Sequence, residues 1–333
     1  MGLERAGRSA GGFAVWRTNA EKESGAGACG GVDLALGIGA NTEIFTLLYG
    51  LVLRSLPAHN PGELVKVGIA SAAYPDEAGA FMPYRMLEAF RAQGASFREL
   101  SAWTGDYVLM KDHEGLIQGY DAGLVSGNAF GLLGLQPYRG RLIEAYDDVR
   151  GGPSNGWPVV LSYSFWNGFY GRAEDIIGKQ ITISDTRVTV VGVTLPDFKG
   201  VWPGDDVKMY FPLQFVTVLE KKDVLGAADN LFGVEVIGRL KPGVSLRQAN
   251  AELGQLQQSL LSRFIPDRFR HDPFFEKAYL MASSARNGLP KCSCSDFDTL
   301  RGLAAYDRRA SRKRSKPARE PVSFQILFWS SRS

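Results

Sequence analysis

The sequence predicts an α+β fold in which two interleaved subdomains follow a single N-terminal membrane helix. The first observation is an apolar run at residues 34 to 53 that has the length of a membrane span. The second is the local alternation of strand and helix patterns between residues 57 and 265. The third is a strand, a turn and an amphipathic helix at residues 233 to 264, which should pack as one unit against a sheet. Together these patterns favour an α+β body over a series of parallel βαβ units.

The run "LALGIGANTEIFTLLYGLVLRSLP" is the candidate membrane helix. Residues 34 to 53 are 20 residues, about the number that a helix needs to cross about 30 Å of hydrocarbon. Glu43 opposes insertion, because an acid at the centre of a span costs about 3 kcal/mol. The alternative is a buried helix in a soluble core. We assign residues 34–56 to a transmembrane helix and expect it to be a weak anchor.

The next elements combine strands and helices. "LPAHNPGELVKVGIA" reads as a turn followed by a strand near residues 63 to 70. A helix is expected from about residue 83 to 93, stopped at Gly94. Two strands should flank a turn at residues 112 to 115, and "GNAFGLLGL" offers a short helix after them.

The most clearly patterned part lies at residues 158 to 194. A short strand at 158 to 161 leads through Ser162, a helix N-cap, into an aromatic helix. Two strands follow at 179 to 184 and 187 to 194. The aromatic stripe could form a base- or sugar-stacking surface, but helical spacing of large aromatics favours core packing. Its members are Tyr163, Phe165, Trp166, Phe169 and Tyr170.

A strand at residues 233 to 240, a Lys-Pro-Gly turn and a helix capped by Ser245 complete the patterned region. Apolar residues in that helix recur at steps of three and four, which predicts one buried stripe. They are Leu246, Ala249, Leu253, Leu256, Leu260 and Phe264.

Past Pro266 the periodicity decays. The last 33 residues carry a net charge of +7 within a total of +3, which leaves a net charge of −4 for residues 1 to 300. A block of like charge is typical of a solvated, disordered segment, and a mildly acidic body excludes a nucleic-acid partner. The expected domains are a cytoplasmic, disordered segment (1–33), a transmembrane helix (34–56), an extracytoplasmic domain (57–265) and an irregular, basic, disordered tail (266–333).

Motifs for catalysis, cofactors and metals are missing from the sequence. Gly37 and Gly39 form only a GxG, without the third glycine or the lysine of a phosphate loop. Cys292 and Cys294 lack the further ligands that zinc sites recruit, and the three histidines lie far apart. We therefore expect no catalytic, cofactor-binding or metal-binding residues.

Five motifs occur in an order that resembles a known family. They are "LALGIGANTEIFTLLYGLVLRSLP", "LVSGNAFGLLGLQPYRGRL", "VVLSYSFWNGFYG", "IIGKQITISDTRVTVVGV" and "RLKPGVSLRQANAEL". Together they are similar to the MacB-like periplasmic core domain of ABC-type permeases, in the branch of orphan permeases without a fused ATPase known from acidobacteria. The resemblance covers roughly residues 34 to 265.

The resemblance implies a subunit of the bacterial inner membrane, with a cytoplasmic N-terminus and a periplasmic main domain that pairs an α/β subdomain with a β-rich one. In the family this domain does no chemistry and transmits motion from a separate ABC ATPase to export or envelope partners. Implied partners are that ATPase, further permease copies in a homodimer, and membrane lipid. The family's FtsX-like C-terminal helices are missing here, so the chain resembles a permease truncated before them, as a frameshifted gene would give.

Two other functions remain as alternatives. One is a stand-alone envelope binding or scaffold module. The other is an envelope hydrolase, for which the adjacent acids Asp147 and Asp148 or Asp205 and Asp206 are the candidates. General acid and base work needs two carboxyls that converge on one substrate, and adjacent residues rarely do so.

Overall fold

The computed structural model describes residues 56–74, 81–227 and 231–289. The helices and strands of these described residues lie in one compact unit that begins at Pro57. They form a large mixed sheet with a few helices, which confirms the α+β class. Among the described residues no helix is both long and apolar enough to cross a bilayer. The expected membrane helix, residues 34–56, lies outside the described ranges apart from Leu56.

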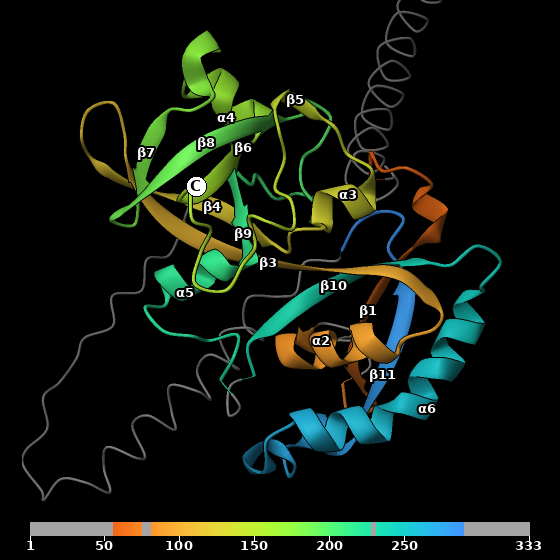
Figure 1. The fold of residues 1–333 in the computed structure, drawn as a ribbon. Coiled ribbons are helices and arrows are strands. Elements are labelled where there is room, and N and C mark those ends of the chain that lie inside the picture. The colour runs from red at the N-terminus through yellow and green to blue at the C-terminus, as the bar shows by residue number, and fades with distance from the viewer. Residues whose placement is uncertain (1–55, 75–80, 228–230, 290–333) are drawn as a thin grey trace, which may run out of the picture. The chain divides into compact units, whose positions relative to one another are not determined.

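The sheet contains eleven strands, with the order β11-β1-β10-β3-β4-β9-β6-β8-β5, while β2 pairs with β10 and β7 with β8 (Figure 1). Most neighbours are antiparallel, but β4 runs parallel to β9 and β6 parallel to β8. The strands are β1 (Leu64–Ser71), β2 (Met82–Pro83), β3 (Phe97–Lys111), β4 (Ile117–Val125), β5 (Pro137–Gly140), β6 (Trp157–Leu161), β7 (Gln180–Ile183), β8 (Thr186–Thr194), β9 (Met209–Pro212), β10 (Gly233–Leu240) and β11 (Ala278–Ser284).

The helices are mostly short. The α-helices are α2 (Tyr84–Gln93), α3 (Ala129–Leu133), α4 (Tyr163–Gly168), α5 (Val216–Leu219), α6 (Leu246–Phe264) and α7 (Pro273–Glu276). Single 3-10 turns form η2 (Pro61–Glu63), η4 (Glu174–Ile176), η5 (Leu213–Phe215) and η6 (Asp267–Phe269). Within the described part of the chain only α2 and α6 reach ten residues, so the strands supply most of its framework.

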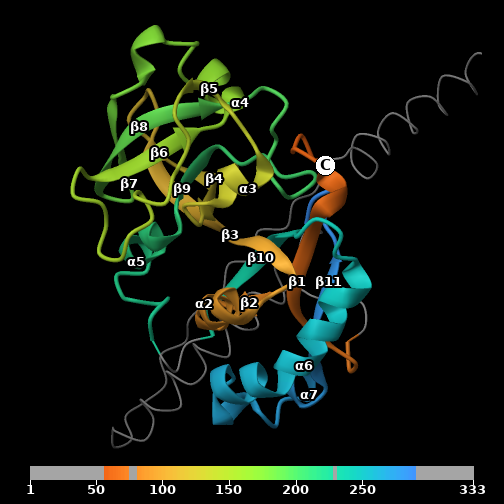
Figure 2. The same ribbon diagram turned by 45° about the vertical axis from the view of Figure 1, so that its right-hand side comes forward.

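Two lobes share this sheet, and both views show them on opposite sides of β3 (Figures 1 and 2). The terminal lobe comprises residues 57–74, 81–104 and 231–289, with β1, β2, β10, β11, α2, α6 and α7. The central lobe comprises residues 105–227, with β4 to β9 and the short helices α3, α4 and α5. The chain leaves the first lobe, builds the second and returns, so the two lobes are interleaved along the chain, as predicted.

Strand β3 belongs to both lobes. Its first half pairs with β10 and its second half with β4, and Trp103 stands opposite Glu235 on one side and Val125 on the other. One continuous strand of 15 residues therefore joins the two parts of the sheet.

Helices α2 and α6 cover one face of the terminal lobe. Ser245 begins α6 with a capping box, in which its side chain accepts from the Gln248 amide and the Gln248 side chain accepts from the Ser245 amide. Ala249, Leu253 and Leu260 of the predicted stripe are buried, and its other members pack against the same core. On the sheet side this core contains Val65, Val67, Ile69, Val234 and Val236.

An aromatic cluster fills the opposite face of the sheet at the junction of the lobes. The Trp103 ring meets Phe130 of α3 at 5.8 Å and Trp202 at 6.5 Å between centroids, both edge to face. Phe130 in turn meets Phe198 and Tyr210. Because edge-to-face packing adds to the burial of large rings, this cluster holds α3 on the sheet.

Helix α4 confirms the predicted capping and packing. The Ser162 hydroxyl accepts from the Phe165 amide at 3.3 Å. Phe165 and Trp166 are buried, while Tyr163, Phe169 and Tyr170 are half-buried against the same core. The aromatic stripe therefore packs, as expected, instead of forming an open stacking surface.

The folded chain continues past residue 265, in contrast to the irregular tail expected from residue 266 onward. Strand β11 pairs with β1 over seven positions, from Val65 opposite Ser284 to Ser71 opposite Ala278. The Asn250 side chain of α6 donates to the Ala282 carbonyl at 2.9 Å and accepts from its amide at 2.8 Å. The Asn250 side chain therefore covers part of the outer edge of β11, where unpaired backbone groups would otherwise be exposed.

Candidate functional site

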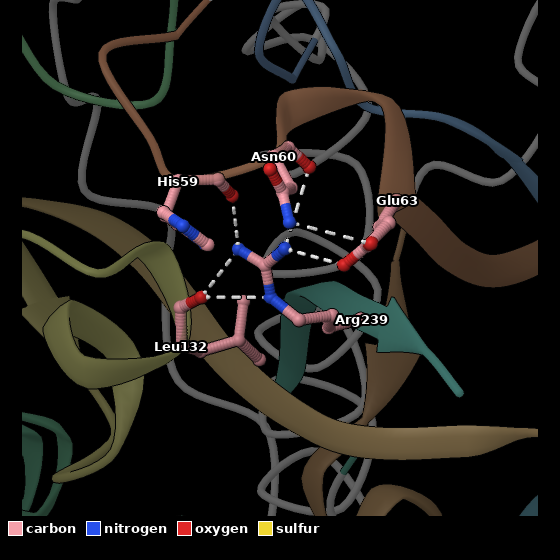
Figure 3. A network of polar contacts seen from close by, with 5 residues as sticks. All are labelled: His59, Asn60, Glu63, Leu132 and Arg239. Carbon is pink, nitrogen blue, oxygen red and sulfur yellow. Dashed lines mark hydrogen bonds and ion pairs between the residues drawn. The ribbon is translucent and has the colours of Figure 1, made fainter. Parts of the chain in front are cut away.

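The candidate site is a polar network around Arg239, at the place where the chain enters the compact unit. It comprises His59, Asn60, Glu63, Leu132 and Arg239, which we call the Arg239 network (Figure 3). Arg239 lies near the end of β10 on the face opposite α2 and α6, and it is only 6% exposed. A buried guanidinium needs acceptors for its five N–H groups.

Two parts of the chain supply these acceptors. Nη2 donates to the His59 carbonyl at 2.6 Å, and Nη1 donates to the Asn60 carbonyl at 3.3 Å and to Glu63 Oε2 at 3.0 Å. The Leu132 carbonyl of α3 accepts from Nε at 3.2 Å and from Nη2 at 2.9 Å. Arg239 therefore binds the segment after Pro57 and the end of α3 at the same time.

Local backbone geometry presents these carbonyls. Asn60 has φ of 47°, a left-handed conformation that asparagine tolerates better than most residues, and Pro61 then begins η2 with a fixed φ. Leu132 lies in the last turn of α3, where helix carbonyls have no partner within the helix. A cation at this end also interacts favourably with the helix dipole.

A second contact fastens the same two segments. The His59 amide donates to the Leu133 carbonyl at 2.9 Å. Gly134 ends α3 with φ of 73°, and a Cβ at this position would stand 2.9 Å from His59 Cβ. Glycine here meets both the left-handed backbone and the close approach of the entering chain.

The adjacent acids Asp147 and Asp148 serve separate structural contacts. Asp147 is fully buried and accepts from Arg141 Nη1 at 2.5 Å, from Nη2 at 2.9 Å and from the Glu144 amide at 3.0 Å. The hydrogen bond and charge of Asp147 raise the pKa of Arg141. These bonds brace the loop after β5 and leave Asp147 no open side for a substrate.

Asp148 points to other partners. It accepts from the Gly127 amide at 3.1 Å and from the Gln214 amide at 2.8 Å. Burial raises its pKa, although those two amides and the charge of Arg91 act in the opposite direction. Acid-base catalysis requires two carboxyls that converge on one reacting atom. Asp147 and Asp148 do not do so.

Asp205 and Asp206 do not converge on a site either. They lie in the loop before β9, where Asp206 is exposed and forms an ion pair with Lys208. The Asp205 amide closes a turn to the Trp202 carbonyl at 3.2 Å. Among the described residues no group of acids, histidines and cysteines could hold a metal ion.

A hollow of about 220 Å³ lies beside the C-terminal end of α2. Arg91 donates to the Leu100 carbonyl there through Nε and Nη2, at 3.2 and 2.9 Å. The Asn128 amide group donates to Glu99 Oε1 at 2.9 Å and to the Leu100 carbonyl at 3.0 Å. These polar groups hold β3, α2 and α3 together. The residues that line the hollow include no serine, threonine, cysteine or lysine beside a base.

Comparisons with solved structures find similar domains, among them the following three. The extracellular domain of the ABC-type transporter YknZ from Gram-positive bacteria is 12% identical, with a TM-score of 0.44, over 66% of this chain and 99% of that one. The periplasmic region of MacB from Actinobacillus actinomycetemcomitans is 13% identical, with a TM-score of 0.46, over 66% and 88%. A domain of a permease-like protein from Porphyromonas gingivalis is 14% identical, with a TM-score of 0.49, over 73% and 98%.

A search of curated proteins finds no match to this chain. The sequence pattern of the MacB-like periplasmic core domain matches residues 34–256. That match runs from the apolar N-terminal run through both lobes to the middle of α6. The chain therefore belongs to the MacB-like periplasmic core domain family.

Proposed function

We propose that this chain is a permease component of an ABC-type transport system, whose extracytoplasmic domain passes ATPase-driven motion on to export or envelope partners. Family membership supports the transport assignment. The observation that carries the mechanical role is the Arg239 network, because it fastens the first residues of the domain to both lobes. A domain that transmits motion needs a stiff connection at the point where the motion enters.

In this proposal residues 1–33 are cytoplasmic, residues 34–56 form a membrane helix, and the domain from residue 57 lies outside the inner membrane. The partners are a separate ABC ATPase, a second permease copy and membrane lipid. The domain performs no chemistry, and the engagement of Asp147 and Asp148 in loop contacts supports this over the hydrolase alternative.

The native cysteines provide a test of this topology. Cys29 precedes the apolar run, whereas Cys292 and Cys294 follow the domain. We expect a membrane-impermeant biotin-maleimide to label the Cys29→Ser variant on intact spheroplasts and to leave the Cys292→Ser/Cys294→Ser variant unlabelled. After lysis both variants should be labelled, which is the matched control. Equal labelling of the two variants before lysis would contradict the proposed orientation.

The transport assignment needs a second experiment. The tagged full chain, purified from its own host after mild cross-linking, should bring down an ATPase that carries a GxxxxGK[ST] phosphate loop. Mass spectrometry identifies that loop directly, and Glu43→Lys, which should block insertion of the apolar run, is the matched control. A binding or scaffold module would be recovered without such an ATPase.

A further inference from the structure

We propose that Arg239 is the positioning residue that makes residues 59–63 and the C-terminal end of α3 move as one body with β10. The inference rests on the proposed function in one respect, namely that motion enters the domain at Pro57. Residues 59–63, α3 and β10 all lie in the compact unit that begins at Pro57.

The base of the Arg239 side chain is held rigidly. All eight residues of β10 are buried, and the strand pairs with β1 on one side and β3 on the other. Arg239 stands opposite Leu64 of β1 and Glu99 of β3. The guanidinium is therefore attached to the middle of the terminal lobe.

The far end of the side chain holds two segments that have no shared strand pairing. Residues 59–63 precede β1 and contain only the 3-10 turn η2, while α3 belongs to the central lobe. Removing the guanidinium leaves the carbonyls of His59, Asn60 and Leu132 without these donors. Among the hydrogen bonds of the described residues, the one from the His59 amide to the Leu133 carbonyl then remains to join the two segments directly.

The fork of the guanidinium makes arginine specific for this role. Its donors lie in one plane and reach acceptors on both sides of the entering chain, whereas a lysine ammonium is a point charge on a flexible stem. Without the network, a displacement at Pro57 would reach β1 through the covalent chain and α3 through the single bond from the His59 amide to the Leu133 carbonyl. With the network, the same displacement reaches β1, β10 and α3 together.

Hydrogen exchange on the full chain in detergent tests this coupling, because local opening frees amides for exchange. We expect Arg239→Met to accelerate exchange about tenfold or more in peptides covering residues 57–66 and 129–137. Peptides covering 180–194 and 246–264 should exchange as in the unmodified chain. Arg98→Met is the matched control, because Arg98 is an exposed arginine on β3 of the same sheet. It should change the exchange rates of neither pair of peptides.

Arg239→Lys and Glu63→Gln keep the test decisive where Arg239→Met fails to fold. Arg239→Lys should accelerate exchange in both segments, 57–66 and 129–137. Glu63→Gln keeps an acceptor for Nη1 and should therefore accelerate exchange less. Acceleration at residues 57–66 without any change at 129–137 would overturn the proposal. Uniform acceleration in all peptides would also overturn it, since Arg239 would then act only as a general stabiliser.

The outcome is independent of the transport assignment. Exchange measures coupling inside the domain with no ATPase present, so a negative result would leave the permease function standing. Conversely, failure to recover an ATPase would leave the coupling between the two segments intact.

Discussion

The terminal and central lobes share one sheet but are built from the chain in different ways. The terminal lobe joins β1, β10 and β11, which lie far apart in sequence, and every residue of β1 and β10 is buried. The central lobe uses one continuous stretch, residues 105–227, and its outer strands β5 and β7 alternate between exposed and more buried positions. The terminal lobe is thus a stiff frame closed by long-range pairing, whereas the central lobe is a locally folded insertion.

This difference explains where the two lobes can be coupled. They meet along β3, in the aromatic cluster around Trp103, and at the Arg239 network. All three contacts lie close to α3, the short helix that approaches the terminal lobe. Substitutions at the junction should therefore affect both lobes, and substitutions elsewhere should affect one.

The largest effect is expected for Trp103→Ala, which should reduce the free energy of unfolding by about 3 to 5 kcal/mol because it leaves a large cavity. Both lobes should lose protection from hydrogen exchange, since Trp103 stands on the shared strand. Trp103→Phe keeps a ring but loses the bond from Nε1 to Ser101 Oγ, 2.9 Å long, and should cost less. Urea denaturation measures the stabilities, and loss of protection in one lobe alone would argue against a shared junction.

Leu280→Ala should cost about 2 to 3 kcal/mol, at the lower end for a buried leucine because β11 is an edge strand that can relax. Leu280 is buried in β11, and its loss should loosen β1 and α6. Leu161→Ala on β6 is the matched substitution in the central lobe. Hydrogen exchange should respond in the terminal lobe for the first variant and in the central lobe for the second. The same response pattern for both would contradict the division into lobes.

The two serine caps allow a finer comparison. Ser245→Ala should destabilise by roughly 0.5 to 1 kcal/mol, because water can replace the cap at this exposed helix start. Ser162→Ala should cost about 2 kcal/mol, since Ser162 is buried and the Phe165 amide would be left without a partner. Thermal or urea unfolding of the two variants measures the difference. A larger loss for Ser245→Ala would show that burial does not control the cost.

The smallest effect concerns pH. Burial opposes ionisation of Glu252, but hydrogen bonds from Ser96 and Ala95 and the charge of Lys241 lower its pKa below the ordinary value of 4.5. A lowered pKa in the folded state stabilises the protein above pH 4.5, and this contribution is lost as the pH falls through the folded value. The free energy of unfolding, measured between pH 3 and 7, should therefore fall less steeply with decreasing pH in Glu252→Gln than in the unmodified chain. Identical pH profiles would mean that this contact between α6 and the α2–β3 turn adds no stability.

Local signals predicted much of the fold. The strand at 233 to 240 has its expected bounds, and both serine caps are where the sequence indicates. Strands defined by long-range pairing were harder to predict. β11 is short and its pattern is interrupted by polar residues, so only its pairing with β1 makes it a strand. The first half of β3 is buried on both faces around residues 100 to 104, and it therefore lacks the alternation that marks a half-exposed strand.

The Arg239 network could not be predicted from the sequence for a different reason. Four of the five hydrogen bonds of Arg239 go to backbone carbonyls. Every residue has a backbone carbonyl, so the amino-acid sequence does not indicate which of them bind a guanidinium. The one available signal is an arginine within the apolar strand pattern "GVEVIGRL". That pattern also fits an exposed position on a half-buried strand, so burial of Arg239 became evident only from the structure.

The order of β1, β10 and β11 along the chain has a consequence for biogenesis. β1 ends at Ser71, and its two neighbours begin at Gly233 and Ala278. Ile69 and Ser71 of β1 form early bridges with Phe81 and Tyr74. The rest of both edges of this apolar strand stays unpaired during vectorial synthesis until about 160 or more further residues have emerged. The central lobe can fold from its own contiguous residues in the meantime. We expect the emerging chain to need a holdase, because an apolar strand that waits for its partners is prone to aggregate.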